Sequence, residues 1–180
     1  SIYDLAEKSS FEEVVYLLWN AKLPTKKNLN KFKKDLNKNM NLNSNIKKMI
    51  ESFPKSVVPM SGLRTIVSAL ALYDSDSKDI SEKANKRKAI RIMASMPSIV
   101  AGIQRRREGK KILNPKKNLS LAGNFLYMLK GKSPSKEEEK TLDVALILHA
   151  EHGMNASTFA SRVTVATLSD LHSGMVSAIS

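Results

Sequence analysis

The sequence predicts an all-α fold, and three observations carry that prediction. Apolar residues recur every three or four positions along most of the chain, as at Leu29, Phe32 and Leu36, which is the spacing of one helix face. Serine or threonine begins most of these stretches, and glycine or proline follows most of them. No stretch alternates apolar and polar residues convincingly, so no strand is expected. The pattern accommodates about nine helices.

The first predicted helix begins at a capping box. Ser9 and Ser10 precede two glutamates at the spacing that lets side chains bond the free backbone N–H groups of a first turn. This helix should run through Trp19 and stop before Pro24, which cannot continue it. The next helix should start at Thr25 and present its apolar face up to Met40. A short helix should follow over residues 44–53.

Two longer segments of small residues occupy the middle of the chain. Residues 59–74, PMSGLRTIVSALALYD, carry a single charge before the final aspartate. Residues 81–108 form a long predicted helix that is basic at first, apolar in its middle and bent at Pro97. Small side chains allow helices to approach closely, so both segments should be buried or lie at an interface. Gly109 should end the second.

The remaining helices are expected near 119–131, 135–153, 155–168 and 170–180. Ser135 with Glu138 forms another capping box. Gly153 is the expected end of the helix that this box begins, and a new helix should open at Asn155. The chain therefore breaks between two helices within LHAEHGMNAST, residues 148–158.

Charge favours a nucleic-acid partner only superficially. The net charge is +13, with 30 Lys and Arg against 17 Asp and Glu. The basic residues are spread over residues 1–140, and only Arg162 lies beyond them. Aromatic residues that could stack on bases are scarce in the sequence and do not alternate with the basic runs. We therefore interpret the lysines as solvated helix faces and expect no nucleic-acid partner.

Other classes of protein are excluded by what the sequence lacks. There is no cysteine, hence no disulfide framework and no cysteine-based metal site or nucleophile. The longest apolar run, 144–148, is far too short to span a bilayer, and no secretion signal opens the chain. We expect a cytoplasmic protein without a membrane partner. The missing initial methionine and the small apolar residues at 174–180 suggest a fragment of a longer protein.

The histidines of LHAEHGMNAST suggest a metal site, but their spacing argues against it. His149, Glu151 and His152 are three possible ligands. Zinc-protease helices space two histidines four residues apart, whereas these two are three apart. No further histidine or cysteine lies nearby to complete a zinc site. We expect no metal.

A small anion is a better fit to this segment. His152 stands at the end of one helix, where the dipole favours a protonated imidazole. The next helix, capped by Asn155 or Ser157, begins at once and directs its free N–H groups outward. These groups could hold a carboxylate. His149 is expected to pack in a helix interface and to bond a backbone carbonyl, and His172 to be structural.

Longer segments add a family resemblance. LHAEHGMNASTFASRVTVATLSDLHSGMVSAI resembles the corresponding segment of citrate synthases, in particular the bacterial and archaeal form. So do YDLAEKSSFEEVVYLLWNAKLPT, VPMSGLRTIVSALALYD, IRIMASMPSIVAGIQRRREGK and LAGNFLYMLKGKSPSKEEEKTLDVALILHAEHG, in the same order. The 2-methylcitrate synthases share the same type of segment. The resemblance implies the large helical domain of that fold, a homodimer formed through the helices near 59–74 and 81–108, and a place in the citric acid cycle.

The resemblance also implies roles for single residues. His152 matches the family's oxaloacetate-binding histidine, and Asn155 lies beside it in the same site. Ser157 matches a serine that supports the first catalytic histidine. Gly153 replaces a residue that is usually acidic, and His172 stands where a tyrosine is common, so neither inherits a role. Acetyl-CoA would be a substrate, and no cofactor is implied.

The reaction implied is the condensation of acetyl-CoA with oxaloacetate, followed by hydrolysis of citryl-CoA to citrate and CoA. The family's two catalytic histidines, its catalytic aspartate and the small domain are expected beyond Ser180. Residues 1–180 should therefore be part of the large domain, without the small domain and the catalytic C-terminal half, and inactive alone. Two alternatives stay open: a 2-methylcitrate synthase that uses propionyl-CoA, and a non-enzymatic basic helical scaffold or nucleic-acid-binding module.

Overall fold

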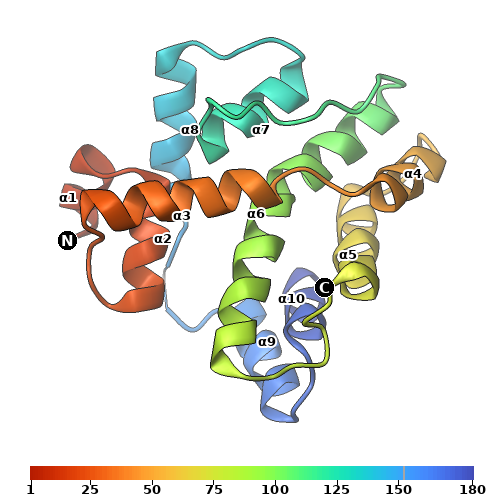
Figure 1. Cartoon of the computed structure of the whole chain (residues 1–180). Helices are drawn as coiled ribbons and strands as arrows, with labels where there is room; N and C mark the ends of the chain where they lie inside the picture. The colour runs from red at the N-terminus through yellow and green to blue at the C-terminus, as the bar shows by residue number, and fades with distance from the viewer. Residues whose placement is uncertain (152) are drawn as a thin grey trace.

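The computed structural model describes residues 1–151 and 153–180, and all regular structure within them is helical (Figure 1). The all-α prediction is confirmed. The helices are α1 (Ile2–Lys8), α2 (Phe11–Asn20), α3 (Lys26–Asn39), α4 (Ser44–Ser52), α5 (Pro59–Leu70), the short 3-10 helix η1 (Ala71–Tyr73), α6 (Glu82–Arg107), α7 (Leu121–Lys130), α8 (Lys136–Leu148), α9 (Ala156–Ala166) and α10 (Leu171–Ile179). None of these described helices is long and apolar enough to cross a membrane.

Helix α6 is the centre of the fold. It contacts α3, α4, α5, α7 and α10, which lie around it in Figure 1. Ile99 and Ile103, in its middle, pack against Ile46 of α4 and Ile66 of α5, and all four are almost fully buried. This confirms that the apolar middle of the long helix is buried against several neighbours. Pro97 lies inside the helix and does not end it.

Buried carboxylates join helices that are distant in sequence. Asp143 of α8 accepts the backbone N–H of Phe11, the first residue of α2, at 3.0 Å. Glu12, only 3 % exposed, accepts the N–H of Leu121, the first residue of α7, at 3.0 Å. Because the N–H groups of a first helical turn lack partners within their own helix, such carboxylates cap one helix from another. They tie α2 to both α7 and α8.

The structure differs from the sequence prediction in one additional helix and in the end of another. Residues 2–8 form α1, with Ser1 and Asp4 in a capping box, a helix too short to show a clear apolar period. Helix α8 ends at Leu148, not at Gly153, and His149 is its C-cap. Gly153 instead turns the connection to α9 with φ of +91°, a conformation that glycine adopts without strain.

The last two helices form a hairpin. Helix α9 has no buried residue and packs chiefly on α10. Helix α10 in turn packs on α5 and α6, with Met175, Val176 and Ile179 against the apolar core. Thr164 and Ser177 share a hydrogen bond of 2.7 Å across the hairpin. The position of α9 therefore depends mainly on α10.

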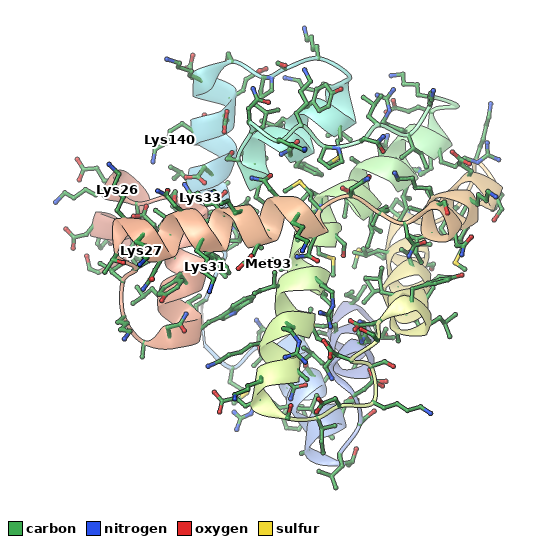
Figure 2. All side chains as sticks on the ribbon, viewed as in Figure 1. Lys26, Lys27, Lys31, Lys33, Met93 and Lys140 are labelled. Carbon is green, nitrogen blue, oxygen red and sulfur yellow. The ribbon has the colours of Figure 1, made fainter. Side chains whose placement is uncertain are left out.

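An apolar groove with a volume of about 650 Å³ runs beside α6 and is also lined by residues of α2, α7, α8 and α10. Met93, Met96 and Pro97 line it from α6, Phe125 from α7 and Leu146 from α8. Figure 2 labels Met93 on the α6 ribbon. Apolar surface of this extent is normally covered in folded proteins.

Candidate functional site

The candidate site lies between the end of α8 and the start of α9. Asn155 is the N-cap of α9, and its side-chain oxygen accepts the backbone N–H of Thr158 at 2.8 Å. Ser157 occupies the first turn of α9 and is exposed. The structure thus brings Asn155 and Ser157 to the same helix start, as the sequence predicts.

A tight turn leads into this helix start. The backbone N–H of Gly153 donates to the carboxylate of Glu151 at 2.5 Å, and the N–H of Asn155 donates to the carbonyl of Gly153 at 3.0 Å. Met154, between them, is exposed, and its sulfur accepts a hydrogen bond from Nη1 of Arg162 in α9 at 3.6 Å. This turn places Asn155 at the N-cap of α9.

Two parts of the predicted site are not tested by the described residues. His152, the principal predicted ligand, lies outside them, so its assignment to oxaloacetate stays a prediction. The catalytic histidines and aspartate expected beyond Ser180 stay a prediction as well. Ser180 itself is the C-cap of α10, and its backbone N–H donates to the carbonyl of Val176 at 3.1 Å. It serves the helix end and has no predicted role in the site.

The structure corrects the expectation for His149. Its Nδ1–H donates to the carbonyl of Ala145, one turn earlier in the same helix, at 2.7 Å. The predicted bond to a carbonyl is therefore present. The side chain is exposed, however, and does not pack in a helix interface, because α8 ends one residue earlier and leaves His149 as its C-cap.

The chemistry available here is that of anion binding. The N–H groups at the start of α9 carry the positive end of the helix dipole and point away from the helix. Asn155 uses its oxygen for the cap, and Ser157 offers a hydroxyl on the outside of the first turn. Within the described residues, no group of three His, Cys, Asp or Glu side chains could hold a metal ion.

A cluster of charged residues that the sequence analysis missed lies where α10 meets the segment before α6. Arg91 of α6 holds Asp74 through two hydrogen bonds of 2.6 and 3.0 Å, and also bonds Asp76 at 2.7 Å. Arg87 adds two bonds to Asp76, of 2.7 and 2.9 Å. These bonds from Arg87 and Arg91 hold the pKa of Asp76 well below its usual range. The cluster fixes the turn after η1 onto α6.

His172 of α10 closes this cluster. It is 2 % exposed, and its Nε2 lies 3.5 Å from a carboxylate oxygen of Asp74. Its Nδ1 lies 3.6 Å from Asp170 without a hydrogen bond. Burial lowers the pKa of His172, although both aspartates oppose this, so the imidazole is neutral at neutral pH. The structural role expected for His172 is confirmed.

The sequence carried only a weak signal for this cluster. Aspartates recur at 74, 76 and 79 just before a helix with arginines at 87 and 91. Nothing in that spacing indicates that a histidine about a hundred residues later completes the group, because the contact depends on how α10 packs.

Comparison with known proteins places this geometry in a family. The sequence pattern described as "Citrate synthase, C-terminal domain" matches residues 1–180. The chain belongs to the citrate synthase family. Citrate synthase 2 of Bacillus subtilis (strain 168) is 46 % identical over 179 residues, which are 99 % of this chain and 48 % of that protein. A 2-methylcitrate synthase of Mycobacterium tuberculosis (strain ATCC 25618 / H37Rv) is 39 % identical over 178 residues, covering 99 % of this chain and 45 % of that protein.

Solved citrate synthases have the same fold. The crystal structure of citrate synthase from Pyrobaculum aerophilum superposes with a TM-score of 0.93 at 35 % identity, over 99 % of this chain and 46 % of that one. The ternary complex of citrate synthase from Thermoplasma acidophilum with carboxymethyl coenzyme A and oxaloacetate also gives 0.93, at 29 % identity, over 99 % of this chain and 47 % of that one. The chain thus spans about half the length of the citrate synthases that it matches.

Proposed function

We propose that the chain serves in a citrate synthase, which condenses acetyl-CoA with oxaloacetate and hydrolyses citryl-CoA to citrate and CoA. The observation that carries this proposal is the family match along residues 1–180. The Thermoplasma acidophilum relative, whose fold this chain shares, was solved with oxaloacetate and a coenzyme A derivative. The enzyme is an acyltransferase, with acetyl-CoA as substrate and no cofactor, and a cytoplasmic location fits the bacterial relatives.

The start of α9 is proposed to hold oxaloacetate. His152 would donate a charge-assisted hydrogen bond to a substrate carboxylate, and the dipole of α9 would add to it. Asn155 would hold the helix start in place through its cap to Thr158. Ser157 would support a catalytic histidine supplied by the rest of the enzyme, beyond Ser180. In this division of roles, the groups that act as acid and base lie outside residues 1–180. The chain alone should therefore not catalyse the reaction.

A homodimer is part of the proposal. Within the segment 59–74, Met60, Leu72 and Tyr73 are exposed by 53, 77 and 48 %, although all are large and apolar. Such side chains are typical of interfaces. Most of the middle of α6 is buried within this chain, so α6 would contribute only its outward face, including Val100.

A 2-methylcitrate synthase is the second candidate, because one relative of that name is 39 % identical. The full-length protein would be supplied with oxaloacetate and either acetyl-CoA or propionyl-CoA, and released CoA measured with a thiol reagent. We expect a higher kcat/KM for acetyl-CoA. A preference for propionyl-CoA would establish the second candidate, and no CoA release from either would refute both. Residues 1–180 alone should release none above background, and turnover by them would contradict the division of roles above.

A further inference from the structure

Four lysines form a stripe along the exposed side of α3. Lys27, Lys31, Lys34 and Lys38 are exposed and follow one another at intervals of four, three and four residues. That spacing puts about one lysine on each turn of the same helix face, with Cβ atoms some 5–6 Å apart. Figure 2 labels Lys27 and Lys31 on this helix.

The stripe costs α3 stability. Like charges three and four residues apart repel each other on a helix. Lys26 and Lys27 also lie in the first turn, where the dipole disfavours cations, and no acidic residue accompanies them there. Within the described part of the chain, none of the four stripe lysines has a carboxylate within 4.0 Å. The one ion pair of α3 recorded there joins Lys33 to Glu12 at 3.8 Å.

Some cations at the ends of α6 are paired, but most other exposed lysines in the described residues, like those of the stripe, have no carboxylate within 4.0 Å, and the stripe differs from them in its alignment along one helix face. At the start of α6, Lys86 pairs with Glu82 at 2.8 Å and Arg87 with Asp76 at 2.7 Å. At its end, Lys110 pairs with Glu108 at 2.7 Å. A row of unpaired charges that helix stability does not explain indicates a partner of opposite charge.

An aromatic pocket adjoins the stripe. Its volume is about 250 Å³, and Lys31 of the stripe lines it together with Trp19, Tyr16, Lys86 and one carboxylate residue, Asp35. Trp19 is 36 % exposed and held edge-on against Phe32, with ring centroids 5.7 Å apart. The sequence separates Trp19 from the lysine run, but the packing of α2 on α3 brings them together.

We propose that the stripe and this pocket bind single-stranded nucleic acid, with phosphates along the four lysines and one base on Trp19. An accessible aromatic surface beside a row of cations is what single strands require, since every base can stack and every nucleotide carries a phosphate. An acidic polypeptide would use the lysines and have no need of Trp19. The site is separate from the start of α9 and goes beyond the proposed function. It also replaces the expectation of no nucleic-acid partner, which rested on the separation of aromatic and basic residues along the sequence.

Trp19 provides a direct measurement, because it is the only tryptophan among residues 1–180 and the difference between wild type and Trp19→Leu isolates its fluorescence in the full-length protein. Titrating the full-length protein with oligouridylate should quench its fluorescence. The affinity, measured by anisotropy of a labelled oligouridylate, should fall with salt at a log–log slope of about −3, as expected for four phosphates on a single strand. A slope near zero, or binding without quenching, would contradict the proposal.

Variants separate the stripe from net charge. Replacing Lys27, Lys31, Lys34 and Lys38 by Gln should remove most of the salt dependence. The matched control replaces four other exposed lysines, Lys48, Lys78, Lys111 and Lys132, by Gln and should leave affinity within about twofold. Equal losses in the two variants would refute a localised site.

Trp19→Leu tests the base contact. It should weaken oligouridylate binding by about tenfold while leaving the salt slope unchanged. Polyglutamate of equal length should bind more weakly than oligouridylate and equally well to wild type and Trp19→Leu. If polyglutamate bound as well as oligouridylate, or if Trp19→Leu had no effect on oligouridylate, the surface would be one for acidic proteins and the proposal would fall. Neither the four-lysine variant of the stripe nor Trp19→Leu should change the rate of citrate formation.

Discussion

His172 shows how a single buried residue makes stability depend on pH. Asp74 and Asp170 face it from two sides, while Lys88 and Arg91 of α6 lie close enough to oppose its charge. Because burial lowers its pKa in the folded protein, the unfolded chain takes up a proton first as pH falls. Its contribution to stability is therefore complete above the ordinary histidine pKa, near 6.5, and is lost as pH drops below that value.

We expect the denaturant concentration at the unfolding midpoint to decrease as the pH is lowered from 8 to 5. The decrease should be smaller in His172→Gln. Chemical unfolding at intermediate pH values measures this. His149→Gln is the control, since His149 is exposed and lies outside this charged cluster. Parallel slopes for wild type and His172→Gln would show that other groups cause the dependence.

The two histidines near α9 should behave differently in the full-length enzyme. His152→Ala should raise the oxaloacetate KM and lower kcat/KM by about tenfold to a hundredfold, since losing a hydrogen bond to a charged partner costs roughly 1.5–3 kcal/mol. His149→Ala should change oxaloacetate kinetics little and, because the side chain is exposed, should change stability little as well. Loss of oxaloacetate binding in His149→Ala alone would mean that the wrong histidine is assigned.

At the scale of helices, the α9–α10 hairpin depends on close approach at Gly174. A Cβ added there would lie 2.7 Å from Cγ1 of Val165 and 3.2 Å from the hydroxyl of Ser161. Gly174→Ala should therefore lower the free energy of unfolding by about 1–3 kcal/mol. Adding Val165→Ala should restore part of it by making room.

Gly102 of α6 provides the comparison for that prediction. A Cβ at this buried glycine would meet its nearest neighbour, Ile50, at 3.5 Å, an ordinary contact. Gly102→Ala should be neutral or stabilising, because alanine is the better helix former. Thermal unfolding of the three variants would test the argument, and equal losses at Gly174 and Gly102 would contradict it.

Local chemistry explains which elements the sequence could predict. Thr25, Ser81 and Ser120 accept the backbone N–H three residues later, as expected of residues that begin helices. The end of α8 could not be placed, because Gly153 has the conformation typical of a helix end but terminates a turn instead. The bonds from Asp143 to α2 and from Arg91 to Asp74 depend on tertiary packing and leave no trace in local spacing.

The candidate site follows the same division. The start of α9 could be predicted from its cap, so Asn155 and Ser157 are found together. The exposure of His149 could not be predicted, since it depended on where α8 ends. The aromatic pocket beside α3 was missed for a different reason: Trp19 and Lys31 meet only through the packing of α2 on α3.

For the whole molecule, the exposed apolar residues of η1 lead to a test of the proposed dimer. Light scattering of the full-length protein at micromolar concentration should give the mass of a dimer. Leu72→Glu should raise its dissociation constant by at least about tenfold, because a charge would be buried at the interface. Leu168→Glu is the control: Leu168 is 78 % exposed against 77 % for Leu72, but lies outside the proposed interface. A stable wild-type monomer would refute the dimer.

The hairpin that carries the candidate site has a further consequence for how the chain opens. Since α9 has no buried residue and packs chiefly against α10, few contacts oppose its local unfolding. Amide hydrogens of α9 should exchange with solvent far faster than those in the middle of α6, where the surrounding helices must separate first. A ligand that binds at Asn155 and Ser157 selects the ordered form of α9, so substrate affinity includes the free energy of ordering this helix. Slowed exchange confined to α9 would therefore report oxaloacetate binding even where no reaction takes place.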